Sequence, residues 1–206
     1  MKLLVVGATG GVGHHVVDQA LAAGHTVHAF ARSSLDRSHD ELRVFTGDAT
    51  RPGALDDALA GVDAVICAIG GGLSDRTTRT EATRALVAAM PPAEVKRLVV
   101  VSSLGAGDSY RRVGFATKAI VKTLLRNAIH DHDGQEGAVR SSATEWTILR
   151  PGGLSDEPLG DSRVVIGSEG SLSGRGRVSR ATVAQRALQA LDEPSWRGKA
   201  VAVLAS

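Results

Sequence analysis

The chain has 206 residues, 43% of them hydrophobic, which is enough for one domain with a sizeable core. Its 24 basic and 22 acidic residues leave a formal charge of only +2, which argues against a nucleic-acid partner. No apolar run approaches the ~18 residues of a membrane span, no targeting signal is visible, and the single cysteine, Cys67, excludes an internal disulfide. We therefore expect a cytoplasmic protein that binds neither membranes nor nucleic acid.

Short β-branched runs alternate along the chain with alanine-rich stretches of helical character. Strands are predicted near residues 2–6, 26–30, 42–46, 63–68, 97–102, 146–149 and 200–204. Helices are predicted at 11–23, 53–60, 76–90, 115–128, 132–143 and 180–191. Because the strands are too apolar to leave one face in water, they are typical of a parallel sheet covered by helices on both sides. This order predicts a Rossmann-type, doubly wound α/β fold in one domain, residues 1–206.

The segment 151–177 departs from this alternation. It is rich in Gly, Ser and Asp and contains one strand-like run at 163–166. We expect it to be an excursion at the carboxyl edge of the sheet, where folds of this class bind their ligands.

The first predicted strand runs directly into the glycine motif GATGGVG, residues 7–13. At the turn from a strand into a helix, Gly7 can make the tight turn, Gly10 lets the backbone approach a ligand, and Gly13 lets the helix pack closely on the strand. A diphosphate would rest on the free N–H groups of the helix, whose dipole also favours negative charge. We therefore predict that a dinucleotide binds at Gly7, Thr9, Gly10, Gly11, Val12 and Gly13.

The end of the second predicted strand indicates which dinucleotide is bound. An NAD-preferring site carries an acidic residue there for the ribose 2′-hydroxyl, and the stretch TVHAFARSS has none. It offers instead Arg32, Ser33 and Ser34, a guanidinium with two hydroxyls, which suits a 2′-phosphate. NADP(H) is therefore favoured over NAD(H); the alternative is that Arg32 is an ordinary solvated arginine.

Four stretches together resemble the atypical short-chain dehydrogenase/reductases, which bind NAD(P): GATGGVG, GDAT at 47–50, VVVSS at 99–103 and EWTILRPGGLSDEP at 145–158. Over nearly its whole length the chain is most similar to the small branch with biliverdin reductase B, a flavin reductase, and NmrA-like proteins. The resemblance implies that Asp48 and Ala49 lie against the adenine and that residues 151–154 border the nicotinamide. The further cofactor contacts that it implies are Ala68, Ile69, Gly70, Ser102, Pro151, Gly152, Gly153 and Leu154.

The Tyr-x-x-x-Lys dyad, in which lysine lowers the tyrosine pKa in larger relatives, is absent. The single tyrosine, Tyr110, is followed four residues later by Gly114. Matching the chain to the family puts Asn127 and Asp131 at the two dyad positions. The sequence therefore predicts a site that works without this dyad.

Three other residues are candidates for the chemistry. The resemblance places Ser103 beside the nicotinamide, where its hydroxyl can donate to an oxyanion; the alternative is that Ser102 and Ser103 only cap the strand end. Tyr110 is a candidate for the substrate mouth or an ordinary loop residue. His132, in the run IHDHDGQE at 129–136, is a candidate proton donor with a pKa near the working pH, or a solvated residue at a helix start. We expect no metal site there.

Two functions fit these features. The first is an NADPH-dependent oxidoreductase that transfers hydride to a flat conjugated small molecule, such as a flavin, a quinone or another conjugated carbonyl. The second is a non-catalytic NADP(H)-binding redox sensor of the NmrA-like type. The enzyme is favoured because 206 residues leave little beyond the binding core for a dedicated partner surface. The sequence leaves the oligomeric state open.

Overall fold

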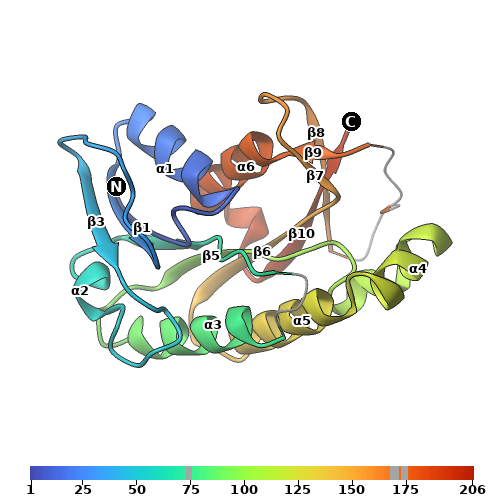
Figure 1. Cartoon of the computed structure of the whole chain (residues 1–206), viewed down its shortest axis with the longest axis horizontal. Helices are drawn as coiled ribbons and strands as arrows, with labels where there is room; N and C mark the ends of the chain where they lie inside the picture. Colours follow the sequence, from blue (N-terminus) through green and yellow to red (C-terminus); the bar gives the residue numbers. More distant parts are fainter. Residues whose placement is uncertain (73–75, 168–171, 173–175) are drawn as a thin grey trace.

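The computed structural model describes residues 1–72, 76–167, 172 and 176–206. Its centre is an eight-stranded sheet with the strand order β3-β2-β1-β4-β5-β6-β10-β8 (Figure 1). The strands are β1 (Lys2–Val6), β2 (Thr26–Ala31), β3 (Leu42–Thr46), β4 (Ala64–Cys67), β5 (Arg97–Val101), β6 (Glu145–Pro151), β8 (Ser162–Ile166) and β10 (Lys199–Ala205). A second, two-stranded sheet pairs β7 (Leu154–Ser155) with β9 (Val178–Ser179). Each predicted strand is present, and the Rossmann-type α/β fold is confirmed.

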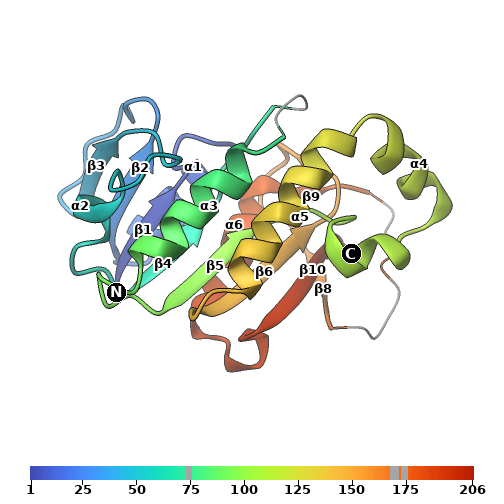
Figure 2. The same cartoon turned by 90° about the horizontal axis from the view of Figure 1, so that it is seen from below.

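Helices cover both faces of the sheet. They are α1 (Gly13–Ala22), α2 (Asp56–Leu59), α3 (Thr78–Ala89), α4 (Phe115–Thr123), α5 (Arg126–Arg140) and α6 (Arg180–Asp192), with 3₁₀ turns η1 (Gly107–Arg111) and η2 (Pro194–Trp196). Helices α1 and α6 lie on one face and α2, α3 and α5 on the other, with α3 and α5 side by side (Figures 1 and 2). Helix α4 lies at the end of the molecule opposite β3 in both views.

Alternating side chains of the strands fill two apolar layers. In β1, Leu3 and Val5 pack under α1 and α6, whereas Leu4 and Val6 pack toward α2 and α3. All four side chains are at most 1% exposed, so the strand reads as one apolar run. Cys67 lies in the second layer and is fully buried.

The strand order reverses next to β1. The chain passes from β1 out to β2 and β3, and then returns to β4 on the other side of β1, with parallel pairing throughout. The carboxyl ends of these strands therefore share one edge of the sheet, and the reversal leaves a crevice there, which is where such folds bind ligands.

The sheet differs from the prediction at one edge. Strand β8 pairs with β10 in the antiparallel sense, with Val203 opposite Val164. The strand-like run predicted at 163–166 therefore belongs to the main sheet rather than to a free excursion. The chain between these two strands contains β9 and α6. Residues 168–171 and 173–175 of the predicted excursion lie outside the described residues.

The predicted helices at 115–128 and 132–143 were wrong in their boundary. Helix α4 ends at Thr123, and α5 already begins at Arg126. The run HDHDGQE looks solvated in the sequence, but inside α5 its residues Asp131, His132, Gln135 and Glu136 are buried. Asp131, Gln135 and Glu136 have hydrogen-bond partners on other elements, and the His132 ring lies against Gln135 of the same helix. Within the described ranges, no helix is long and apolar enough to cross a membrane.

Candidate functional site

The glycine motif forms the turn from β1 into α1. Gly7 has φ +86°, and a Cβ atom there would lie 2.7 Å from the Ala68 carbonyl oxygen. A Cβ atom at Gly13 would overlap the Gly7 carbonyl oxygen, so this glycine allows α1 to pack on the end of β1. Both positions therefore need glycine for the backbone geometry of the turn.

A cavity of about 340 Å³ opens at this turn, on the carboxyl edge of the sheet. It collects residues that follow four different strands, at the point where the strand order reverses. Its lining consists of Val6, Gly7, Thr9, Gly10, Phe30, Ala31, Arg32, Gly47, Asp48, Ala49, Thr50, Ile69, Gly70, Gly71, Gly72, Thr78 and Ala82. We call it the glycine-loop cavity.

The structure brings eight of the predicted cofactor residues to this cavity: Gly7, Thr9, Gly10, Arg32, Asp48, Ala49, Ile69 and Gly70. The other predicted contacts are not part of its lining: Gly11, Val12, Gly13, Ser33, Ala68, Ser102, Pro151, Gly152, Gly153 and Leu154. Gly11 to Gly13 form the start of α1, and Ala68 is buried behind Gly7. Residues 151–154 run from the end of β6 to the start of β7, and β6 lies three strands away from β1 in the main sheet.

Asp48 is held in a tight local turn beside the cavity. Its Oδ1 accepts hydrogen bonds from the Thr50 backbone N–H, at 3.0 Å, and from the Thr50 hydroxyl, at 2.8 Å. The bond from the Thr50 backbone lowers the pKa of Asp48 below its usual value. Asp48 therefore stays ionised, and it both caps the turn and lines the cavity.

Sequence reasoning missed the residues that support the rim formed by Gly70–Gly72. Arg79, at the start of α3, is 6% exposed and donates a hydrogen bond of 3.1 Å to the Gly71 carbonyl. Its guanidinium also pairs with Asp131 of α5, at 3.2 Å. A polar helix start in the sequence gives no sign that its arginine turns inward.

Asp131, at the position that the family match gave to the dyad lysine, serves α3 instead. Its carboxylate accepts the backbone N–H groups of Arg79 and Thr80, each at 2.9 Å, and so caps the helix from a neighbouring element. Burial opposes ionisation, but the hydrogen bonds prevail and lower the pKa of Asp131. The sequence predicted a site without the Tyr-x-x-x-Lys dyad, and Asp131 has this structural role in place of a dyad lysine.

The expected pKa of His132 was wrong. The side chain is 8% exposed, inside α5, and its Nδ1 lies 3.1 Å from Oε1 of Gln135. Burial lowers the pKa of His132 to about 4, so the imidazole is neutral at neutral pH and lacks the acidic proton of an imidazolium there. Among the described residues, no group of three or more His, Cys, Asp or Glu side chains could hold a metal ion.

Ser102 and Ser103 follow β5 and have different surroundings. The buried Ser102 hydroxyl donates to Glu136 Oε1 at 2.8 Å, which ties the end of β5 to α5. Ser103 is half-buried, and its hydroxyl donates a long bond of 3.3 Å to the Leu104 carbonyl. Only the Ser103 hydroxyl is therefore held loosely enough to turn toward a ligand.

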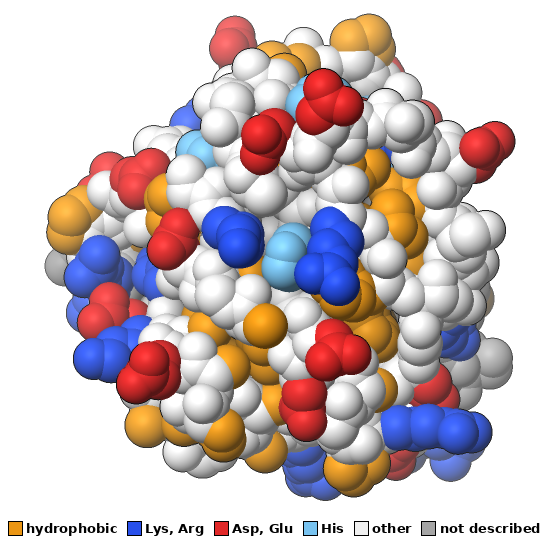
Figure 3. All heavy atoms as spheres, turned by 90° about the vertical axis from the view of Figure 1, so that its left-hand side faces the viewer, with side chains coloured by type: hydrophobic (Ala, Val, Ile, Leu, Met, Phe, Trp, Pro, Cys, Tyr) orange, Lys and Arg blue, Asp and Glu red, His pale blue; other side chains and the backbone are white. Residues whose placement is uncertain are grey.

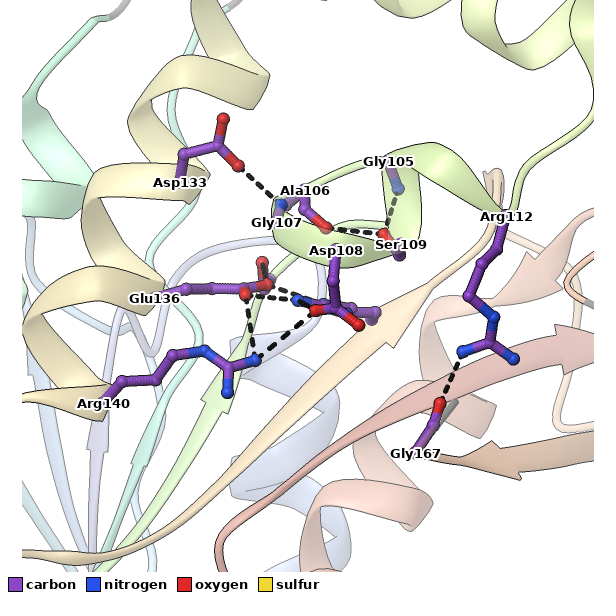
Figure 4. Close-up of polar contacts among 12 residues, drawn as sticks. Gly105, Ala106, Gly107, Asp108, Ser109, Arg112, Asp133, Glu136, Arg140 and Gly167 are labelled. Atoms are coloured by element: carbon purple, nitrogen blue, oxygen red, sulfur yellow. Dashed lines mark hydrogen bonds and ion pairs between the residues drawn. The ribbon is translucent and has the colours of Figure 1, made fainter. Parts of the chain in front are cut away.

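Glu136, which accepts the Ser102 hydroxyl and is labelled in Figure 4, forms a buried ion pair with Arg150. Arg150 donates from Nε at 2.8 Å and from a terminal nitrogen at 2.6 Å to the two Glu136 oxygens. The same terminal nitrogen reaches Asp108 of η1, at 2.8 Å. Burial alone would lower the pKa of Arg150, but its bonds to Glu136 raise it. The pair thus links α5, β6 and η1.

We expect Glu136→Ala to lower the free energy of unfolding by about 3–5 kcal/mol, because Arg150 would be left buried without its main partner. Asp108→Ala is the matched control, since the Asp108 side chain is 62% exposed, and it should cost less than about 1 kcal/mol. Urea denaturation of both variants measures the difference. Equal losses would show that the buried pair does not stabilise this junction.

Tyr110 lines a second cavity, of about 600 Å³, between η1, α4 and α5. The other lining residues are Gly105, Gly107, Val121, Lys122, Arg126, Ile129, His130 and Asp133. We call it the α4–α5 cavity. On a different face, the one on the side of β3, acidic, basic and apolar side chains are intermixed and neither sign of charge dominates (Figure 3).

Comparison with known proteins agrees with this geometry. A family model described as NAD(P)H-binding matches residues 7–194. The Bacillus subtilis protein YwnB is 24% identical, with 99% of this chain and 98% of YwnB covered. ChuY, an anaerobilin reductase from Escherichia coli O157:H7, is 26% identical, with a TM-score of 0.81 over 99% of this chain and 97% of ChuY. A short-chain dehydrogenase/reductase from Veillonella parvula, solved with NADP, shares the fold at 19% identity, with a TM-score of 0.84 over 99% and 94% of the two chains.

Proposed function

Because this chain belongs to the NAD(P)H-binding family, we propose that it is an NADPH-dependent reductase whose acceptor is a flat conjugated molecule such as a flavin, a quinone or another conjugated carbonyl. The observation that carries the proposal is the glycine-loop cavity, which lies at the strand reversal and combines the glycine motif with Arg32 and Asp48. The reductase neighbour ChuY supports the reaction class.

The residues of the glycine loop fit a dinucleotide diphosphate. No side chain caps the N-terminus of α1, and its first turn carries no acidic residue, so neither competes with phosphate oxygens for the N–H groups there. Gly10 lines the cavity without a side chain, and a Cβ atom there would already lie 3.1 Å from the Gly7 carbonyl oxygen. The loop thus combines free donors with room for close approach.

Arg32 supports a preference for NADPH. It is exposed at the end of β2 and lines the cavity, and no acidic residue follows β2 directly to receive a ribose 2′-hydroxyl. A guanidinium in this place can form charge-assisted hydrogen bonds with a 2′-phosphate. Asp48 faces the same cavity, but its Oδ1 is occupied by Thr50.

We expect Arg32→Ala to weaken NADPH binding by ~1.5 to 3 kcal/mol and to leave NADH binding nearly unchanged, since only NADPH carries the 2′-phosphate. Dissociation constants of both nucleotides measure the effect. Arg43→Ala is the control, because Arg43 is exposed on β3, lies over the Phe45 ring and does not line the cavity. Equal weakening of NADPH and NADH by Arg32→Ala would contradict the assignment.

The bound nicotinamide supplies the hydride, and the chain supplies position. In this proposal Ser103 donates its hydroxyl proton in a hydrogen bond to the oxygen or nitrogen of the acceptor that gains charge. Solvent completes the protonation, because His132 is neutral and its Nδ1 lies against Gln135. The glycine loop and Arg32 hold the cofactor.

The test of the function is NADPH oxidation with a panel of flavins, quinones and conjugated enones. The reaction is monitored through the loss of the absorbance of the reduced nicotinamide. We expect turnover with at least one acceptor, and slower turnover with NADH at equal concentration. Tight NADPH binding without turnover of any acceptor would instead favour the NADP(H) sensor.

A further inference from the structure

The α4–α5 cavity has an apolar interior. Val121 of α4 and Ile129 of α5 are buried, 5% and 7% exposed, and both line it. Gly105 has φ +103°, and a Cβ atom there would lie within 3.6 Å of the Val121 and Ile129 side chains. Tyr110 of η1 adds an aromatic wall. This part of the cavity suits the flat, apolar body of an organic molecule.

The rim of the cavity is positively charged. Lys122 of α4 and Arg126 at the start of α5 both line it, and both are exposed. Within the described ranges, their side chains have neither a hydrogen-bond partner nor an ion-pair partner. His130, one turn after Arg126, lines the same rim. Two unpartnered cations beside an apolar interior favour an anionic ligand over a neutral one.

Asp133 is the acidic residue among the described lining, and it is already engaged. Its carboxylate accepts the Gly107 backbone N–H at 2.7 Å (Figure 4). Burial raises the pKa of Asp133 above its usual value, and the hydrogen bond from the Gly107 N–H opposes this shift. Asp133 therefore fixes η1 against α5, and its carboxylate offsets only one of the two positive charges of Lys122 and Arg126.

The cavity begins next to the serine that we place at the acceptor. Gly105 is two residues after Ser103, a distance of at most ~7 Å along the backbone. The connecting loop is held by Ser109, whose hydroxyl accepts the Gly105 N–H at 2.9 Å and donates to the Ala106 carbonyl at 2.6 Å (Figure 4). Ser103 and the cavity wall are thus parts of one ordered loop.

We propose that the acceptor is an organic anion, whose carboxylate, sulfonate or phosphate group is held by Lys122 and Arg126 in the α4–α5 cavity. Its conjugated part then lies between Tyr110 and Ser103. This inference rests on the proposed reductase function and specifies the class of its substrate. It also gives Tyr110 a part in packing against the acceptor rather than in proton transfer.

The test uses two flavins that share one redox-active ring system, riboflavin, which is neutral, and flavin mononucleotide, which carries a phosphate. Their affinities are measured by fluorescence quenching on the protein with NADP⁺ present, and NADPH oxidation is followed for both. We expect the wild type to prefer the mononucleotide at least about tenfold, the range of one or two charge-assisted bonds. The Lys122→Ala/Arg126→Ala double variant should bring the affinity ratio close to one.

The matched control is Lys96→Ala/Lys199→Ala, which removes the same charge from exposed positions at the amino ends of β5 and β10. It should keep the wild-type ratio. Equal affinities for the two flavins in the wild type, including no detectable binding of either, would overturn the proposal, as would a lost preference in the control. If riboflavin and flavin mononucleotide bind equally well and oxidise NADPH equally fast, the anion site is refuted and the reductase function is retained. If flavin mononucleotide binds more tightly but neither flavin oxidises NADPH, the reductase function is refuted and the anion site is retained.

Discussion

Replacing Gly10 with valine should weaken NADPH and NADH binding at least about 100-fold while the protein remains folded. A Cβ atom at Gly10 would lie 3.1 Å from the Gly7 carbonyl oxygen, a distance that small shifts of the turn can relieve. The two methyl groups beyond it would extend into the space through which a diphosphate must approach the N-terminus of α1. The cost therefore falls on the ligand far more than on the fold.

Titration calorimetry with both nucleotides, together with thermal denaturation, separates these effects. Gly137→Val is the matched control, since Gly137 is exposed on α5 and a Cβ atom there meets nothing within 4 Å. It should bind NADPH as the wild type does. A folded Gly10→Val protein with unchanged affinity would refute the diphosphate site.

Replacing Ser103 with alanine should lower kcat and kcat/KM together by ~10- to 1000-fold, without weakening NADPH binding. The hydroxyl would stabilise charge that is present only in the transition state, so its loss would not show in the ground state. The long bond to the Leu104 carbonyl, 3.3 Å, is a weak competitor for that hydroxyl.

Steady-state kinetics with the best acceptor of the panel tests this role. Ser103→Thr is the conservative variant and should recover most of the rate, because it restores the hydroxyl. Full activity of Ser103→Ala would remove Ser103 from the reaction and leave solvent as the proton source. A loss of NADPH affinity in the alanine variant would instead give Ser103 a part in cofactor binding.

The sheet and the glycine loop could be predicted because local signals agree there with the fold. Leu3 to Val6 form an uninterrupted apolar run since both faces of β1 are covered, and Gly7 and Gly13 stand where the turn leaves no room for a Cβ atom. The cavity residues Arg32 and Asp48 follow strands directly, so the shared edge of a parallel sheet brings them together.

The burial of polar residues in α3 and α5 could not be predicted in the same way. Asp131 and His132 look solvated in the sequence, but Asp131 caps α3 and the His132 side chain is buried in α5. The burial of Asp131 depends on Arg79 and Thr80, some fifty residues away in the sequence, and hydrophobic periodicity carries no information on such pairs. The same holds for Arg79, whose contact with Gly71 supports the rim of the cavity.

The α4–α5 cavity could not be predicted from the sequence for a related reason. The break between Thr123 and Arg126 divides one predicted helix into two, and only this break places Lys122 and Arg126 around a common space. The sequence left Tyr110 as a candidate for the substrate mouth or an ordinary loop residue, and the structure places it in the lining of the α4–α5 cavity.

The most direct test of the central claim, that the glycine-loop cavity is an NADPH site, is calorimetric titration of the wild-type protein with NADPH and with NADH. We predict one NADPH per chain, bound about 10- to 150-fold more tightly than NADH, which is the difference that the 2′-phosphate contact of Arg32 should make. Equal affinities for the two nucleotides, or no binding of NADPH, would contradict it.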